Sequence, residues 1–75
     1  MSTPTEAIRL KLMADNEEYR RLQEAHNQYA AELDHLEAKP FLSEAERLEE
    51  VRLKKLKLRL KDQMITLIKR AETAA

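Results

Sequence analysis

Residues 43–71 read SEAERLEEVRLKKLKLRLKDQMITLIKRA and carry the clearest structural signal in the chain. Ser43 and Glu46 have the spacing of a capping box, in which each side chain accepts a hydrogen bond from the other residue's backbone N–H. With about 100° between successive helical residues, the apolar side chains that follow form two separate stripes. The first stripe comprises Leu53, Leu56, Leu60, Met64 and Leu67, and the second, on nearly the opposite side, comprises Leu48, Val51, Leu58 and Ile65. This pattern predicts a helix over residues 43–71 with two apolar faces.

Two apolar stripes indicate two packing partners for this helix, because each stripe gains by leaving water. The rest of the chain offers only one partner helix. A chain of 75 residues without cysteine also buries little surface, and chains of this size are marginal unless they associate. We therefore expect self-association through this helix, as a four-helix bundle or a larger homo-oligomer. The sequence leaves open which stripe is internal, and a different protein is the alternative occupant of the other stripe.

The first half of the chain predicts a helix over residues 4–38. Thr3 and Glu6 have the spacing of a capping box at its start. Apolar residues then recur at three- and four-residue intervals and form a seam. The seam comprises Ile8, Leu12, Tyr19, Leu22, Tyr29, Leu33 and Leu36, with gaps at Asp15 and His26. The stretch Asp15-Asn16-Glu17-Glu18 also resembles a new helix start, which favours a break or kink near residues 15–16 over one continuous helix.

A short connection at residues 39–42 joins the two helices. Lys39 precedes Pro40 and is therefore disfavoured in helical geometry. So short a loop places the two helices antiparallel, which predicts an all-α fold with a single domain over residues 1–75, an antiparallel two-helix hairpin. At the tip, Phe41 and Leu42 either pack against the second helix, which we favour, or offer a contact to a partner.

Composition excludes several classes of site. The chain has no Gly, which removes phosphate-cradling loops and dinucleotide fingerprints. It has no Cys, which removes disulfides, thiol nucleophiles and Cys-based zinc sites. No Ser-His-Asp set has a plausible geometry, and a single hairpin offers no deep concave pocket. We therefore expect no catalytic activity and no cofactor.

Charge is balanced overall but divided between the halves. Residues 1–38 carry four basic and eight acidic side chains, and residues 39–75 carry ten basic and six acidic ones. The opposite signs suit two neighbouring antiparallel segments, although exposed ion pairs contribute only about 0.2–1 kcal/mol each. The start of the chain lacks the basic and apolar regions of a signal peptide, and no apolar run approaches the roughly 20 residues of a membrane span. We expect a cytoplasmic protein that does not enter membranes.

Two stretches of the chain resemble the YdcH-like family of small bacterial proteins. They are Tyr19-Arg20-Arg21-Leu22-Gln23-Glu24-Ala25-His26-Asn27, followed by Leu33 and Leu36-Glu37, and Lys54-Lys55-Leu56-Lys57-Leu58-Arg59-Leu60-Lys61-Asp62-Gln63-Met64-Ile65. The resemblance covers roughly residues 12 to 69 and implies a short helical hairpin in a bacterial cytosol, with no established reaction. Family members often carry Asn/Asp-Pro where this chain has Asn16-Glu17, so the resemblance leaves the helix break open.

Two histidines invite a functional interpretation. His26 lies on the seam, where it suits a metal ligand, a proton shuttle or a pH sensor, but where we favour a polar seam residue that fixes helix register. Glu32 and His35 have the spacing of the Glu-x-x-His motif of di-iron bundles. No carboxylate of the second helix lies midway along an apolar stripe to complete such a site, so we expect no metal.

A run of cations in the second helix offers the main alternative function. The run comprises Arg52, Lys54, Lys55, Lys57, Arg59 and Lys61. Such a run is typical of phosphate contacts to RNA or DNA, but these residues surround most of the helix and no aromatic side chain is interleaved for base stacking. We favour a solvated face that pairs with the acidic first helix.

The sequence thus predicts an interaction module rather than an enzyme. The favoured function is a non-enzymatic, self-associating adaptor that uses the second stripe of residues 43–71. The alternative is a ribosome- or nucleic-acid-associated factor that uses the cations of residues 52–61.

Overall fold

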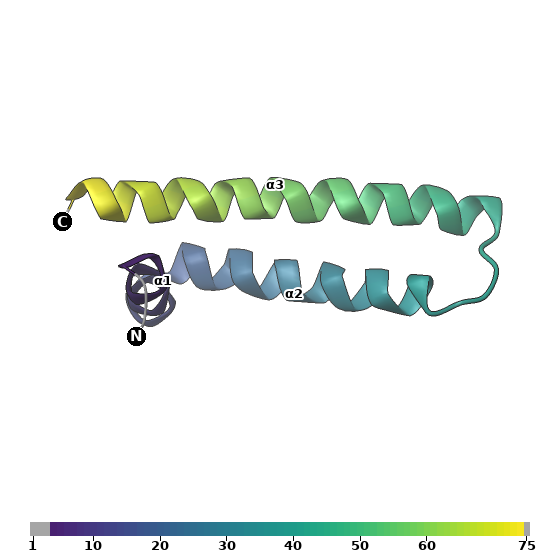
Figure 1. The fold of residues 1–75 in the computed structure, drawn as a ribbon, viewed down its shortest axis with the longest axis horizontal. Helices are drawn as coiled ribbons and strands as arrows, with labels where there is room; N and C mark the ends of the chain where they lie inside the picture. The colour runs from purple at the N-terminus through teal and green to yellow at the C-terminus, as the bar shows by residue number, and fades with distance from the viewer. Residues whose placement is uncertain (1–3, 75) are drawn as a thin grey trace.

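The computed structural model describes residues 4–74, and these form three helices (Figure 1). They are α1 (Pro4–Asp15), α2 (Glu17–Glu37) and α3 (Glu44–Ala74). The all-α prediction is confirmed, since the described residues contain no strand. The break between α1 and α2 lies where the sequence favoured one, near residues 15–16, and the expected cap Thr3 lies outside the described residues.

A break at Asn16 separates α1 from α2. Asn16 has extended backbone angles, φ −114° and ψ 108°, and its Oδ1 accepts a hydrogen bond of 2.9 Å from the backbone N–H of Tyr19. Its own N–H donates to the carbonyl of Leu12 at 2.8 Å. One residue therefore ends the first helix and caps the second, as asparagine does well at an N-cap.

The break turns α1 across the other two helices. Figure 1 shows α1 end-on, while α2 and α3 run across the view. The guanidinium of Arg20 donates from Nη1 to the carbonyl of Ala14 at 3.2 Å. This bond satisfies one of the carbonyls that the C-terminal turn of a helix leaves without a partner, and it ties α1 to α2.

The chain reverses direction at residues 38–43 (Figure 1). The backbone N–H of Ala38 still donates to the carbonyl of Asp34, and helical geometry ends before Pro40. On the far side, the backbone N–H of Ser43 donates to Oε1 of Glu46 at 3.0 Å, and the N–H of Glu46 donates to Oγ of Ser43 at 3.1 Å. These reciprocal bonds are the capping box that the sequence predicts for α3.

The core lies between α2 and α3, which are side by side in Figure 1. It has two clusters. The first contains Tyr19, Met64, Leu67 and Ile68, with Ile8, Leu12 and Leu22 packed against it. The second contains Leu33, Leu36 and Leu53, with Tyr29 and Leu42 packed against it. All members of the predicted seam are buried or half-buried, and Ile68 is a core residue that the two-stripe pattern missed.

The tip separates its two apolar residues. Leu42 is half-buried and packs against the second core cluster. Phe41 is 88% exposed, so the expectation that it packs against the second helix is wrong for this residue. The loop brings Leu42 toward the core and leaves the preceding side chain, Phe41, in solvent.

Candidate functional site

The structure assigns the two stripes of α3 to different environments. The first stripe is buried or half-buried against α2. The side chains of the second stripe remain exposed, at 69% for Leu48, 48% for Val51, 60% for Leu58 and 38% for Ile65. We call these four residues the outer face. They resolve the question that the sequence left open, since the internal stripe is the one that contains Leu53.

The outer face has the seven-residue spacing of a coiled-coil seam at Val51, Leu58 and Ile65. At about 100° per residue, Lys55 and Asp62 lie along one edge of this line, between its apolar residues. Lys54 and Lys61 lie along the other edge of the same line, each one residue before Lys55 and Asp62. The outer face therefore has one edge of mixed charge and one edge of positive charge.

Two cations of the run over residues 52–61 are partly neutralised within their own chain. Nζ of Lys54 lies 3.6 Å from Oε1 of Glu50. Arg52 donates to the two carboxylate oxygens of Glu49 at 3.0 Å and 2.6 Å. This contact lowers the pKa of Glu49 and raises the pKa of Arg52, in both cases chiefly through the side-chain hydrogen bond.

The remaining cations of the run do not form a continuous ridge. Lys55, Arg59 and Lys61 are exposed and Lys57 is half-buried, and they point around the circumference of α3. In the part of the chain that the structure describes, no ion pair joins α2 to α3. The ion pairs of this run therefore form along α3 itself, and the expected pairing with the acidic half of the chain involves no direct ion pair. The pKa of Arg52 is raised chiefly by its hydrogen bond with Glu49 and, to a lesser degree, by the charge of Glu32 on α2.

His26 is half-buried on α2, on the seam between the residues of the two core clusters. Its Nδ1 is buried and has no hydrogen-bond partner among residues 4–74. The expected register-fixing hydrogen bond across the seam is thus missing at this atom. A buried polar atom without a partner costs about 1–3 kcal/mol of stability.

The Glu-x-x-His pair lies beside a shallow hollow. Glu32, His35 and Glu49 line this hollow together, over a floor that includes Leu36 and Leu53. Because Glu49 is engaged by Arg52, its carboxylate is not free to complete a ligand set. Within residues 4–74, no group of three or more His, Cys, Asp or Glu side chains has an arrangement that could hold a metal ion.

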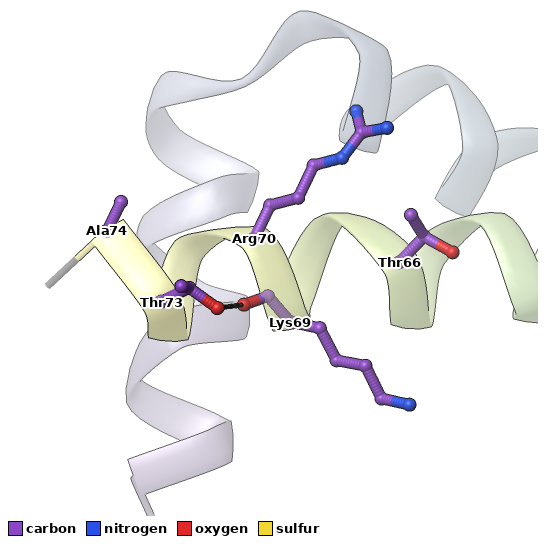
Figure 2. A pocket seen from close by; sticks show the side chains of 5 residues that line it. All are labelled: Thr66, Lys69, Arg70, Thr73 and Ala74. Atoms are coloured by element: carbon purple, nitrogen blue, oxygen red, sulfur yellow. Dashed lines mark hydrogen bonds between the residues drawn. The ribbon is translucent and has the colours of Figure 1, made fainter.

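A second hollow lies near the C-terminal end of α3 and is formed by that helix alone. Thr66, Lys69, Arg70, Thr73 and Ala74 line it. Figure 2 shows the Lys69 and Arg70 side chains extending in different directions, while the Thr73 hydroxyl donates to the Lys69 carbonyl at 2.8 Å. The two cations do not converge, so this surface has no geometry for binding a single anion.

A third cavity lies where all three helices meet. It has a volume of about 270 Å³ and brings Arg9 of α1 and Gln23 of α2 to His26 and Lys61. Its remaining lining consists of Met64, Ile65 and Ile68 of α3. The sequence singled out His26 and Lys61 separately, but it did not identify Arg9 or Gln23. No signal in the sequence could have joined them, because the cavity depends on the direction in which α1 turns after Asn16.

In the described part of the chain, every helix is too short or too polar to cross a bilayer. A family model described as "Protein of unknown function (DUF465)" matches residues 19–68. The matched region covers most of α2 and most of α3 and leaves α1 outside. Comparisons with curated proteins and with solved structures find no match.

Proposed function

The chain belongs to the DUF465 (YdcH-like) family of proteins of unknown function, and from this premise we propose that it is a non-enzymatic helical module of the bacterial cytoplasm that self-associates through α3. The observation that carries the proposal is the outer face, with four large apolar side chains exposed on one helix. Contiguous exposed apolar surface on a small chain is typical of an interaction site. The occupant we propose is the outer face of a second copy, and the pair of copies then places four long helices, α2 and α3 of each chain, in one assembly.

An antiparallel pair of α3 helices suits the positions on this face. With Leu58 near the two-fold axis, Val51 of one copy lies opposite Ile65 of the other. In the same arrangement Lys55 lies near Asp62 of the second copy, about one residue from the position directly opposite along the helix. The two-fold symmetry creates the same pair again, between Asp62 of the first copy and Lys55 of the second. Two complementary charge pairs therefore flank an apolar centre.

The positive edge favours the antiparallel arrangement over a parallel one. A parallel pair would place Lys55 beside Lys54 of the second copy and would leave Asp62 to pair with Lys61. Lys54 is already held by Glu50, and Lys61 lines the cavity beside His26. Since Lys54 already has a partner in its own chain and Lys61 lines that cavity, we infer that the pair of Lys55 with Asp62 is the main electrostatic contact with a second copy.

Size-exclusion chromatography with light scattering over a dilution series tests the proposal. We expect a mass of two or more chains for the native protein and a single chain for Leu58→Glu, because a carboxylate at the centre of the face would be buried without a partner. The matched control is Leu10→Glu, which changes a leucine of α1 that is 69% exposed and lies off the outer face. A monomeric native chain at tens of micromolar would contradict self-association and would indicate a different protein as the occupant.

A charge exchange tests the orientation. Lys55→Asp and Asp62→Lys each place like charges together in the antiparallel pair, so each should weaken association by about two- to fivefold. The double variant Lys55→Asp/Asp62→Lys restores complementary pairs and should return association to nearly the native level. Additive losses in the double variant would contradict the antiparallel arrangement.

The cations of α3 support a second candidate, a nucleic-acid- or ribosome-associated factor. Lys55 and Arg59 are exposed and form no ion pair within residues 4–74. The chain has no Trp and only two Tyr, so bound nucleic acid would dominate the ultraviolet spectrum of the purified protein. Replacing Lys54, Lys55 and Lys57 by Glu should abolish such binding, and an unchanged salt-dependent affinity would count against this candidate.

A further inference from the structure

We propose that the cavity between the three helices is a binding site for a small organic phosphate. The inference concerns a site within one chain, formed by residues of a single copy, although the cavity shares Ile65 with the outer face. The cavity volume of about 270 Å³ is below the usual range for drug-sized ligands, which suits a phosphate group with a short apolar substituent.

Two cations from different helices line this cavity. Arg9 reaches it from α1 and Lys61 reaches it from α3, and neither has an ion-pair partner among the described residues. No acidic side chain lines the cavity. An arginine guanidinium and a lysine ammonium are the side chains that bind phosphate oxygens most strongly, through charge-assisted hydrogen bonds. An anion held between them would relieve the repulsion of two cations that share one cavity.

The α2 side supplies neutral donors. The amide of Gln23 already donates from Nε2 to Oδ1 of Asn27 at 3.0 Å, which fixes the orientation of its side chain beside the cavity. His26 also lines the cavity, and its Nδ1 is buried and has no partner within residues 4–74. A buried nitrogen without a partner on a cavity wall is a feature that folding alone does not require.

The third wall of the cavity is apolar. Met64, Ile65 and Ile68 face the same space from α3. Met64 and Ile68 are already buried in the first core cluster, but Ile65 is 38% exposed, and the apolar substituent of a phosphate ester would cover it, whereas an ion with only charged atoms would not. The lining therefore favours an organic phosphate over inorganic phosphate.

The test is a titration of the ¹⁵N-labelled full chain with phenyl phosphate, followed by NMR at constant ionic strength. We expect saturable shifts of amide signals near Gln23 and Ile65. Inorganic phosphate should shift the same signals with an affinity that is several-fold weaker, and benzyl alcohol, which has a similar ring without charge, should not shift them. Constant ionic strength separates site binding from general screening of surface charge.

Arg9→Gln and Lys61→Gln should each weaken phenyl phosphate binding by about fivefold or more, as expected for the loss of one charge-assisted contact. The matched controls are Lys11→Gln on α1 and Arg59→Gln on α3, which remove one charge each from side chains that do not line the cavity. The Leu58→Glu variant keeps every residue of the cavity, and because a second copy on the outer face would cover Ile65, this variant should bind phenyl phosphate at least as tightly as the native chain does. Shifts that do not saturate, or equal losses in the Arg9→Gln and Lys11→Gln variants, would overturn the proposal.

Discussion

At the scale of single residues, the carboxylate of Glu46 connects the loop to the start of α3. It accepts the backbone N–H of Ser43 at 3.0 Å and forms an ion pair with Lys39 across the loop. Together these contacts lower the pKa of Glu46 from its ordinary value of 4.5 to about 2, with the hydrogen bond from Lys39 as the largest cause. One side chain thus both caps α3 and holds the loop that precedes it.

The low pKa of Glu46 predicts an acid-sensitive contribution to stability. A carboxyl whose pKa is lower in the folded chain stabilises that chain above its ordinary pKa, and this contribution is lost as the pH falls from 4.5 toward about 2. We expect Glu46→Gln to be less stable than the native chain at pH 7 and equally stable near pH 2, as measured by urea unfolding at each pH. Glu44→Gln, in the same helical turn, is the control, and parallel pH profiles for the native and Glu46→Gln chains would contradict the assignment.

At the scale of helices, α3 uses its two apolar stripes in different ways. Leu53 is 1% exposed and belongs to the second core cluster, whereas the residues of the outer face, on the opposite side of the helix, are exposed. Along most of its length, α3 therefore packs into the core on one side and faces solvent on the other. This division is what gives a chain of two long helices a surface for a further partner.

The internal stripe predicts a strong dependence on Leu53. We expect Leu53→Ala to destabilise the chain by about 2–5 kcal/mol, because it removes buried methyl groups and leaves a cavity. Leu10→Ala changes the same residue type at a site that is 69% exposed and should stay within about 0.5 kcal/mol of the native value. Thermal and urea unfolding by circular dichroism measure both. Equal costs for the two substitutions would mean that the first stripe is not the core.

Much of the helical pattern could be predicted from the sequence because its signals are local. Ser43 and Glu46 form the predicted capping box, and the seam from Tyr19 to Leu36 is buried as its spacing indicates. The orientation of α1 could not be predicted, because it depends on the packing of Ile8 and Leu12 against residues about 50 positions later in the chain. For the same reason, the sequence could not predict the cavity that Arg9 and Lys61 line.

At the scale of the whole molecule, α1 covers one end of the pair formed by α2 and α3. Ile8 and Leu12 pack against the first core cluster, and Arg20 bonds the end of α1 through the carbonyl of Ala14. α1 also lies outside the region that the family model matches. The position of this helix thus rests on two half-buried side chains, a capped break at Asn16 and one guanidinium.

The guanidinium contact predicts how firmly α1 is held. We expect Arg20→Ala to speed amide hydrogen exchange in α1 by up to about fivefold, since a partly solvated hydrogen bond of this kind is worth about 1 kcal/mol or less. Exchange in the centre of α3 should stay unchanged. Arg21→Ala is the matched control, because Arg21 pairs only with Glu17 on the exposed side of α2. Equal exchange of α1 in both variants would show that Arg20 does not hold the helix.

The division of the core into two clusters also gives the chain a built-in pair of spectroscopic reporters. The chain has two tyrosines, no tryptophan and one phenylalanine, and that phenylalanine is exposed at the tip. Tyr19 belongs to the cluster beneath α1, and Tyr29 packs against the cluster near the loop. The ring signals of the two tyrosines therefore report on opposite ends of the molecule, and the order in which they broaden on heating reads out which end separates first.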